Sequence, residues 1–205
     1  MLDKTLPNIS VMLETHRASE YPRYPVPDGY TLSGYREGFD RAWARIECAA
    51  EGMRSMDYAV GIFHREFGYD PDMARTNCLF LLDAGGVPVS TASLWTGNHT
   101  GVPQPRLHYV ATDPAHEGKG LCKALLTAIF DLQAAQHRGE YMYLTSQPGS
   151  FQAIRLYMRF GFTPYLGPRP VNWQHPDFET DTPRAWRIIQ DKIAEFEHEG
   201  ANNRV

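Results

Sequence analysis

The sequence contains little cysteine and no long hydrophobic run. Its three cysteines, Cys48, Cys78 and Cys122, are odd in number and widely spaced, and no CxxC pair occurs. This pattern indicates neither a disulfide framework nor a zinc ribbon, and we expect no bound metal. No window approaches the length of a membrane span, and the first residues, MLDKTLPNIS, lack the apolar core of a signal peptide. We therefore expect a cytoplasmic protein without a membrane partner.

Runs of like charge are also absent. The formal net charge is -4 and the isoelectric point is near 6.0. Proteins that bind nucleic acids are commonly basic or carry a basic arm, so we expect neither DNA nor RNA as a partner. Hydrophobic residues make up 42% of the 205 residues and charged residues 21%, which is typical of a folded globular domain and not of a disordered chain.

The chain divides into a lead-in, a domain and a C-terminal extension. Residues 1–29 end in SEYPRYPVPDG, whose three prolines and Asp-Gly pair favour an extended segment outside the core. The domain is expected over residues 30–166. Residues 167–205 contain apolar side chains three to four residues apart, which predict an amphipathic helix packed on the same domain.

Hydrophobic periodicity predicts both strands and helices within the domain. Apolar alternation indicates strands, and apolar residues at helical spacing indicate helices. The expected strands cover residues 30–36, 77–83, 87–95, 106–113, 140–146 and 162–167. The expected helices cover residues 38–52, 57–68, 120–139 and 150–161. This order predicts a mixed α/β fold in a single domain.

Two glycines lie between an expected strand and an expected helix, in the stretch DPAHEGKGLCK over residues 113–123. A Rossmann fingerprint needs glycine at Lys123, a Walker A loop needs Ser or Thr after Lys119, and an HExxH zinc motif needs histidine at Gly120, so all three motifs fail. Glycines before a helix let backbone N–H groups approach an anion, which the helix dipole also favours. Gly118 and Gly120 therefore predict a phosphate cradle. A plain strand-to-helix turn is the alternative.

Two signatures around these glycines resemble those of the GNAT acyltransferase superfamily. The glycine signature, Gln or Arg, two residues, Gly, one residue, and Gly or Ala, falls on Glu117 to Cys122 with Gly120 as the matching glycine. The second signature, Asn followed by Ala-x-x-Leu-Tyr and then Gly-Phe, falls on Ser150, Ala153, Leu156, Tyr157, Gly161 and Phe162. Both stand in the expected order. Glu117, Cys122 and Ser150 depart from the signatures.

The resemblance implies the GNAT fold, a central mixed and twisted sheet of about six to seven strands flanked by helices. It also implies acetyl-CoA as a co-substrate, no metal, and a pyrophosphate clamp made of backbone amides at residues 118–123. Side-chain departures need not destroy such a clamp, although a carboxylate at Glu117 repels phosphate unless it points away. The implied cofactor site comprises Val110, Ala111, Thr112, Glu117, Gly118, Lys119, Gly120, Leu121, Cys122, Lys123, Ser150 and Tyr157.

The resemblance assigns catalytic roles to two of these residues. The backbone N–H of Val110 would polarise the thioester carbonyl, as an oxyanion hole does. The hydroxyl of Tyr157 would protonate the departing CoA thiolate. Packing as a core aromatic is the alternative for Tyr157.

The general base is less directly implied. Alternation along the strand predicts Arg106, His108 and Val110 on one face, with Leu107, Tyr109 and Ala111 on the other. The superfamily often places a base near the position of Arg106, but arginine cannot accept a proton at neutral pH. His108 lies on the same face, and an imidazole with a pKa of about 6.5 suits a base, so His108 is our candidate. A half-buried histidine held by hydrogen bonds is the alternative.

The implied activity is N-acetyl transfer from acetyl-CoA to a primary amine of a small-molecule or amino-acid-like acceptor, by direct attack in a ternary complex. A protein or peptide N-acetyltransferase and a non-catalytic acyl-CoA-binding sensor with the same fold are the alternatives. Tyr35, Phe39, Trp43 and Trp95 fall in segments that flank the acceptor site in the superfamily, although packing in the core explains them as well. Assembly as a homodimer is left open.

Overall fold

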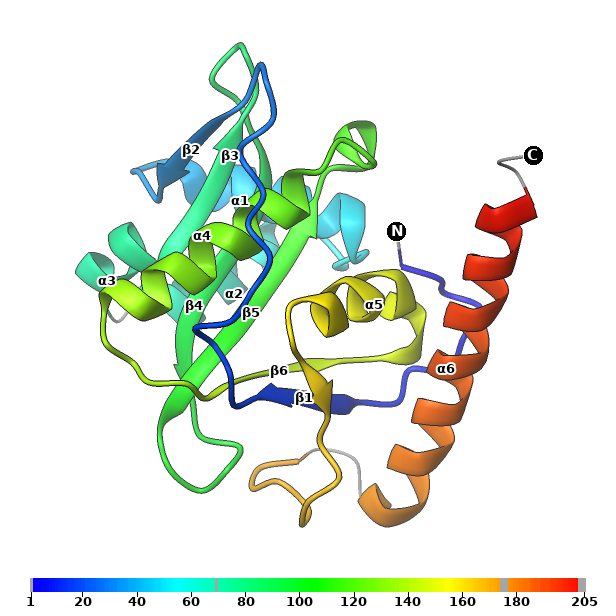
Figure 1. The fold of residues 1–205 in the computed structure, drawn as a ribbon. Coiled ribbons are helices and arrows are strands. Elements are labelled where there is room, and N and C mark those ends of the chain that lie inside the picture. Colours follow the sequence, from blue (N-terminus) through cyan, green and yellow to red (C-terminus); the bar gives the residue numbers. More distant parts are fainter. Residues whose placement is uncertain (1, 69, 174–176, 203–205) are drawn as a thin grey trace.

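The architecture is a seven-stranded sheet with helices on both faces (Figure 1). The structure, a computed structural model, describes residues 2–68, 70–173 and 177–202. The strands are β1 (Val11–Thr15), β2 (Thr31–Gly34), β3 (Cys78–Leu82), β4 (Pro88–Gly97), β5 (Gln104–Thr112), β6 (Met142–Ser146) and β7 (Thr163–Pro164). The helices are α1 (Phe39–Ala50), α2 (Met56–Phe67), α3 (Pro71–Asn77), α4 (Leu121–Ala135), α5 (Phe151–Arg159) and α6 (Phe178–Asn202).

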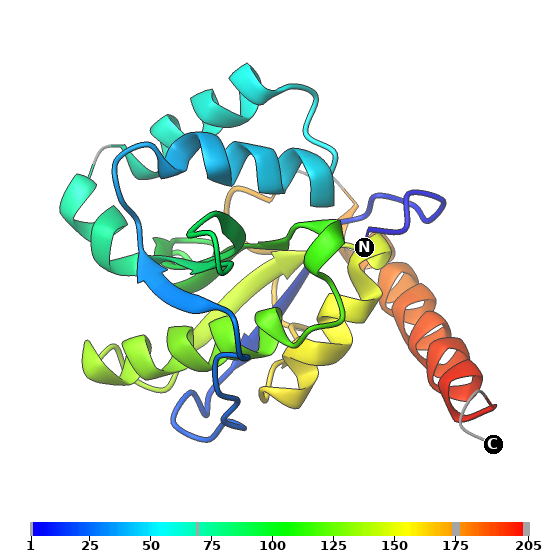
Figure 2. The same ribbon diagram turned by 90° about the horizontal axis from the view of Figure 1, so that it is seen from above.

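The sheet is mixed. Its strand order is β2-β3-β4-β5-β6-β1-β7; β5 and β6 pair in parallel, and the other neighbours pair antiparallel. Helices α1 and α2 cover one face, and α4 and α5 cover the other (Figure 2). The long helix α6 lies beside α5 (Figure 1). The mixed α/β fold in a single domain with a C-terminal helix is confirmed.

Two apolar cores hold the helices on the sheet. On one face, Trp43 and Phe67 of α1 and α2 are fully buried against β3 and β4. On the other face, α4 buries Leu125, and α6 adds Trp186 and Ile189 to the same core. Burial of each large apolar side chain contributes about 1.5–3 kcal/mol. Helix α6 therefore packs against the domain through Trp186 and Ile189.

Strand β1 lies inside the sheet, between β6 and β7. Val11 and Leu13 are fully buried, so the expectation that residues 1–29 form a lead-in is wrong for this strand. A strand covered on both faces lacks the alternation that identifies a half-buried strand, and only the short run Val-Met-Leu remains as a signal. The proline-containing residues 19–29 form no helix or strand, as predicted.

A β-bulge interrupts β5 at Tyr109, whose φ of 48° lies in the left-handed region. The ladder with β4 pairs Ser93 with His108 and Thr91 with Ala111. Two residues of β5 therefore face a single residue of β4 between these pairs. Such a bulge bends its strand and increases the local twist.

The strict alternation expected for this strand is wrong from Tyr109 onward. Leu107 and Val110 both pack toward the core beneath α4. The rings of His108 and Tyr109 both face Phe67 of α2, with centroid distances of 6.2 and 5.9 Å. The extra residue of a bulge shifts the side-chain period by one, which a sequence pattern alone does not reveal.

Strands β5 and β6 share one paired position, Arg106 with Tyr143, and then diverge (Figure 1). Backbone groups of β5 beyond Arg106 on this edge consequently have no ladder partner in β6. Unpaired backbone groups are strong hydrogen-bonding groups that a ligand can satisfy.

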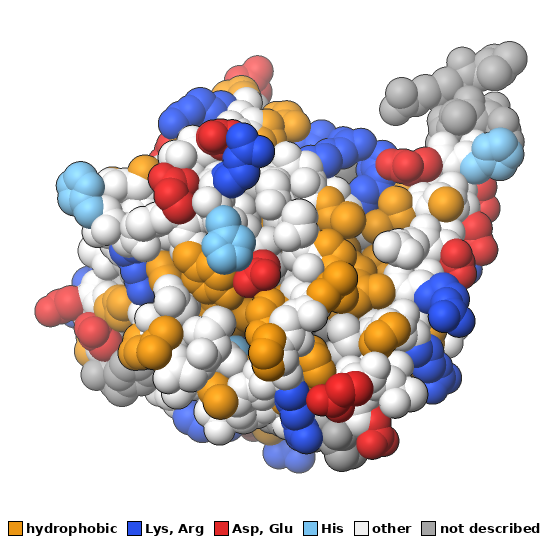
Figure 3. All heavy atoms as spheres, turned by 60° about the horizontal axis from the view of Figure 1, so that its bottom comes forward, with side chains coloured by type: hydrophobic (Ala, Val, Ile, Leu, Met, Phe, Trp, Pro, Cys, Tyr) orange, Lys and Arg blue, Asp and Glu red, His pale blue; other side chains and the backbone are white. Residues whose placement is uncertain are grey.

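One face of the molecule carries side chains of both charges. On the face shown in Figure 3, Lys and Arg side chains are interspersed with Asp and Glu. The three cysteines are free thiols. Among the described residues, no helix is both long enough and apolar enough to cross a membrane.

Candidate active site

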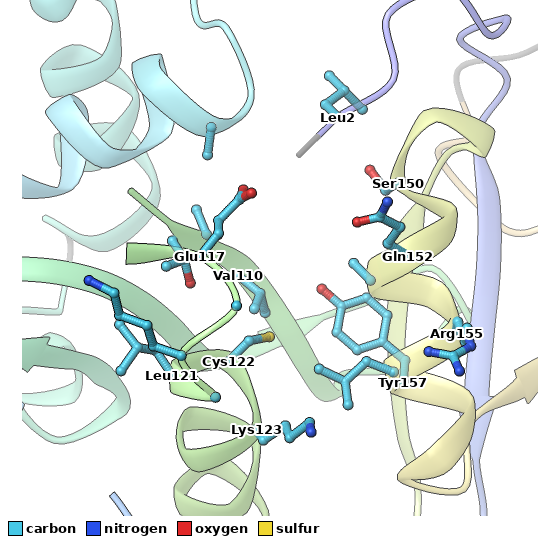
Figure 4. A pocket seen from close by; sticks show the side chains of 18 of the residues that line it. Leu2, Val110, Glu117, Leu121, Cys122, Lys123, Ser150, Gln152, Arg155 and Tyr157 are labelled. Carbon is cyan, nitrogen blue, oxygen red and sulfur yellow. The ribbon is translucent and has the colours of Figure 1, made fainter. Parts of the chain in front are cut away.

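Two adjoining cavities lie where β5 and β6 diverge. The larger, about 1180 Å³, lies between the start of α4 and helix α5 (Figure 4). The smaller, about 390 Å³, is lined by α1, β5, β6 and α5. The residues that line both cavities are Glu51, Val110, Ser150, Ala153 and Tyr157.

The loop before α4 has the geometry of an anion cradle. Gly118 and Gly120 have φ values of 74° and 85°, in the left-handed region that other residues disfavour. Gly120 is the N-cap of α4 without a side-chain cap, and the N–H of Ala124 donates to its carbonyl at 3.2 Å. The N–H groups of residues 121–123 therefore have no partner within the helix and lie beside the larger cavity.

Every residue of the predicted cofactor site lines the larger cavity, and their role in binding stays a prediction. Four basic side chains line this cavity. Lys119 and Lys123 belong to the predicted cofactor site, whereas Arg155 and Arg159 of α5 were not predicted from the sequence. Arg155 Nε lies 2.7 Å from Glu197 Oε1 of α6, so the C-terminal helix closes one side of the cavity. The sequence of α6 contains no motif, so its position beside α5 could not be predicted from the sequence.

The three departures from the signatures all lie at this cavity. Glu117 points its carboxylate away from the first turn of α4, which lessens repulsion of an anion bound there (Figure 4). Burial raises the pKa of the Cys122 thiol to about 12, so this side chain remains protonated and packs against the core. Ser150 is the N-cap of α5, but its side chain makes no capping hydrogen bond, because its φ of -95° and ψ of 24° are not extended.

Tyr157 lies at the junction of the two cavities. Its ring is buried in the core, and its hydroxyl points across the larger cavity toward the side of Val110 and Cys122 (Figure 4). Burial raises the pKa of Tyr157 well above its usual value. The hydroxyl therefore stays protonated at neutral pH. The ring serves the core while the hydroxyl is available as a proton donor.

Val110 lines the same junction from β5. Its backbone follows the bulge at Tyr109, on the part of β5 that has separated from β6. Val110 of β5 and Tyr157 of α5 are far apart in the sequence, and the fold brings both to the junction of the two cavities. A backbone N–H and a phenol at one junction can bind an oxygen and protonate a leaving group.

His108 lines the smaller cavity but is buried and paired. The residue is 9% exposed, and its Nε2 lies 3.7 Å from Oε2 of Glu66 on α2. Burial lowers the pKa of His108 to about 4, and the neighbouring Glu66 offsets this only in part. The imidazole is therefore neutral at pH 7 and would hold an added proton weakly. Its role as the base stays a prediction.

Two carboxyl groups beside the smaller cavity were missed by sequence reasoning. Glu47 of α1 is 1% exposed, and burial, followed by the charge of Glu51, raises its pKa to about 8. Burial raises the pKa of Glu51 too. A signal was present, because Glu47 stands four residues after Trp43 and three before Ala50, on the apolar stripe of α1.

Other candidates lie outside the two cavities. The aromatic residues from segments near the expected acceptor site form the core beneath α1 and α2, so core packing is confirmed for Tyr35, Phe39, Trp43 and Trp95. Within residues 2–68, 70–173 and 177–202, no group of three or more His, Cys, Asp or Glu side chains could hold a metal ion.

Known proteins share this fold. Residues 40–162 match the sequence model of the Acetyltransferase (GNAT) family, and no curated protein matches the sequence. A GCN5-related N-acetyltransferase from Sphaerobacter thermophilus is 19% identical, with a TM-score of 0.58 over 78% of this chain and 50% of that chain. An acetyltransferase of the GNAT family from Colwellia psychrerythraea is 13% identical, with a TM-score of 0.57 over 77% and 53%.

The chain thus spans about half the length of these two proteins, which show the fold. The family match covers more than half of the chain and includes both signatures. The expected GNAT fold is confirmed, and the chain belongs to the acetyltransferase (GNAT) family.

Proposed function

We propose that the chain transfers an acetyl group from acetyl-CoA to a primary amine of a small-molecule or amino-acid-like acceptor, by direct attack in a ternary complex. The observation that carries this proposal is the junction of the two cavities at Val110 and Tyr157. One cavity offers helix N–H groups and basic side chains, and the other offers ionisable side chains. Two substrates can therefore meet with their reacting atoms at the shared residues.

The residues of the larger cavity fit a CoA thioester. Its volume of about 1180 Å³ suits a ligand of that size, and a Cβ added to Gly118 would meet no atom within 4 Å, so the loop is open to a bound group. The amides of residues 118–123 would hold the pyrophosphate with the positive end of the α4 dipole. Lys119, Lys123, Arg155 and Arg159 would add positive charge around it.

Each reacting atom has a partner at the junction. The N–H of Val110 donates to the thioester oxygen, where negative charge develops during attack. The amine nitrogen bonds to the carbonyl carbon, the carbon–sulfur bond breaks, and Tyr157 gives its proton to the departing thiolate. The acceptor must lose a proton before it attacks. His108, with its pKa depressed to about 4, would take that proton only weakly.

The smaller cavity favours a small acceptor over a protein substrate. It has a volume of about 390 Å³ and is lined by buried ionisable side chains, which suit a compact polar molecule. A peptide N-terminus is the competing acceptor, and an acyl-CoA sensor would need no acceptor at all.

The test is a comparison of binding with turnover. Purified protein would be titrated with acetyl-CoA by calorimetry and then incubated with acetyl-CoA and free amino acids, simple alkylamines or an unstructured peptide, with thiol release and product mass recorded. We expect acetylated small amines. Acetylation of the peptide alone would support the peptide alternative, binding without any transfer would support the sensor, and absence of acetyl-CoA binding would overturn the proposal.

A further inference from the structure

Glu47 is an unusual residue for the apolar face of a helix. It is 1% exposed and lines the smaller cavity, and its Oε1 accepts no hydrogen bond from any described residue. Burying a carboxyl group without a partner is unfavourable, because its hydration is lost and nothing replaces it. A ligand that donates to this oxygen would remove that cost.

Arg106 is a second ionisable side chain in the same cavity, and no described residue forms an ion pair with it. Its Nη2 donates to Thr145 Oγ1 at 2.8 Å and its guanidinium lies 5.9 Å from the centre of the Tyr143 ring. Its Nε is buried and donates to no described residue. Burial lowers the pKa of Arg106, and the negative charge of Glu66 offsets this only in part. A buried guanidinium of this kind is suited to a carboxylate or another anion.

The two groups lie at different ends of the cavity. Glu47 lies on the part of α1 that packs against Ala111, the neighbour of Val110 on β5. Arg106 lies four residues before Val110 on β5, where β5 still pairs with β6. The carboxyl of Glu47 is therefore on the side of the reacting atoms, and Arg106 is on the far side.

We infer that the acceptor is an amino acid or a similar amine that carries an acid group, with its anion bound by Arg106 and its ammonium bound and deprotonated by Glu47. This inference rests on the proposed acetyl transfer and narrows its acceptor. A cavity of about 390 Å³ holds one such molecule. Once Glu47 is ionised, it and Arg106 carry opposite charges at the two ends of the cavity, which fixes the orientation, because only one arrangement brings the amine to the junction.

The proton transfers balance in this arrangement. The ammonium gives one proton to the Glu47 carboxylate, and the neutral nitrogen forms the new bond to the acetyl carbon. The nitrogen then loses a second proton to Tyr157, which restores the hydroxyl that protonated the thiolate. Glu47 releases the proton that it took from the ammonium to solvent. A carboxyl group whose pKa is raised to about 8 by burial and by Glu51 is well matched to this exchange.

The pH dependence involves the titratable and charged groups near Glu47 or in the same cavity. Cys48 of α1 and Glu51 at the end of that helix neighbour it. Its charge reaches Tyr157 of α5 and Tyr109 of β5. Arg106 and His108 of β5 line the same cavity. His108 has a pKa near 4 and the tyrosines have raised pKa values, so neither changes charge around neutrality. The rise of activity with pH near neutrality therefore reports Glu47, with the charge of Glu51 acting upon it.

The first test compares acceptors that differ only by a carboxylate. 4-Aminobutanoate and butylamine have amines of similar basicity, and L-leucine with 3-methylbutylamine gives a second pair. We expect kcat/KM for the acid-bearing member to exceed that of its partner by about tenfold or more. Arg106→Met should remove this preference mainly through KM, Arg106→Lys should restore part of it, and the exposed Arg36→Met should leave it unchanged.

The second test uses Glu47→Gln, which keeps the shape of the side chain and removes its acid. At pH 7 we expect kcat to fall about 100-fold, and the rise of kcat with pH near neutrality should disappear, while exposed Glu37→Gln keeps both. Retention of the rise in Glu47→Gln and its loss in His108→Ala would transfer the role to His108.

The inferred acceptor and the proposed acetyl transfer can be overturned separately. Acetylation of both members of each pair with equal efficiency, and with no effect of Arg106→Met, would overturn the inference and leave the proposed function standing. Acetylation of no amine would overturn both. Circular dichroism and acetyl-CoA calorimetry on each variant show whether a loss comes from unfolding, and Arg106→Lys remains the test if Arg106→Met fails to fold.

Discussion

The two cavities are built in different ways. The larger depends at its α4 end on the backbone of residues 118–123, whose glycines and free helix N–H groups lie in one short stretch of sequence. The smaller depends on side chains from separate elements, including Glu47 of α1 and Arg106 and His108 of β5. A backbone site tolerates side-chain departures, whereas a side-chain site is specific to the residues that form it.

This difference explains why the GNAT signatures survive with three departures. Glu117, Cys122 and Ser150 change side chains at a site whose donors are mainly main-chain groups. The smaller cavity has no such shared main-chain basis, since the side chains proposed to bind the acceptor must match that one molecule. Substitutions in the larger cavity should therefore change binding by altering the backbone conformation or by adding charge. Substitutions in the smaller cavity should change activity by removing one functional group.

The largest effect is expected for Gly120→Asp, which should abolish acetyl-CoA binding in calorimetry. The change costs about 1–2 kcal/mol of strain at a φ of 85° and adds a negative charge where the pyrophosphate is expected. Gly101→Asp is the matched control, because Gly101 has a φ of 88° and an added Cβ meets no atom within 4 Å. The control should bind normally. Normal binding by Gly120→Asp would mean that the cradle lies elsewhere.

Glu47→Gln should change how stability depends on pH. The folded pKa of about 8 lies above the ordinary 4.5, so the folded state retains a proton that the unfolded state releases, and stability falls as pH rises from about 5 to 8. Because glutamine does not titrate, the variant lacks this loss and should be about 5 kcal/mol more stable than the parent at pH 9, with little difference at pH 4. Urea unfolding at both pH values measures this. Parallel pH dependence in the two proteins would argue against a buried neutral acid, and Glu37→Gln should behave as the parent does.

Tyr157→Phe should lower kcat about 10–100-fold, which corresponds to about 1.4–2.7 kcal/mol, with acetyl-CoA affinity within about twofold of the parent. The ring stays in the core and only the hydroxyl at the junction is lost. Steady-state kinetics with any accepted amine, together with calorimetry, separates the two quantities. Tyr58→Phe alters an exposed tyrosine and serves as the control. Full activity in Tyr157→Phe would remove the tyrosine from the chemistry.

The smallest effect is expected for Glu117→Gln. Because the carboxylate points away from the first turn of α4, removing its charge should tighten acetyl-CoA binding by less than about 0.5 kcal/mol. Calorimetry at low ionic strength would detect this. A tightening of tenfold or more would show that the carboxylate turns toward the phosphates, and a weaker complex would show that it supports the loop.

The parts of the fold and of the larger cavity that could be predicted are those whose sequence patterns lie within one short segment. Periodicity identified the helices around Trp43 and Trp186, and the glycines identified the start of α4. Strand β1 was missed because burial on both faces removes alternation. The faces of β5 were misassigned because one left-handed residue, Tyr109, shifts the period.

The smaller cavity was only partly predictable. His108 was found because histidine is a conspicuous residue on a strand, yet its burial and pairing with Glu66 could not be known. Glu47 carried a local signal, a carboxyl group on an apolar stripe, whose meaning depends on what the helix packs against. Arg106 appeared only as a residue unable to act as a base. Its lack of a charged partner is a property of the folded chain.

The central claim is that the two cavities are the two halves of one active site that meets at Val110 and Tyr157. A crystal structure with acetyl-CoA tests it most directly. The account predicts the pyrophosphate on the amides of residues 118–123, the thioester oxygen within hydrogen-bond distance of the Val110 N–H, and the sulfur beside the Tyr157 hydroxyl with the acetyl group toward Glu47. Acetyl-CoA bound elsewhere, or with its acetyl group turned away from the smaller cavity, would contradict the account.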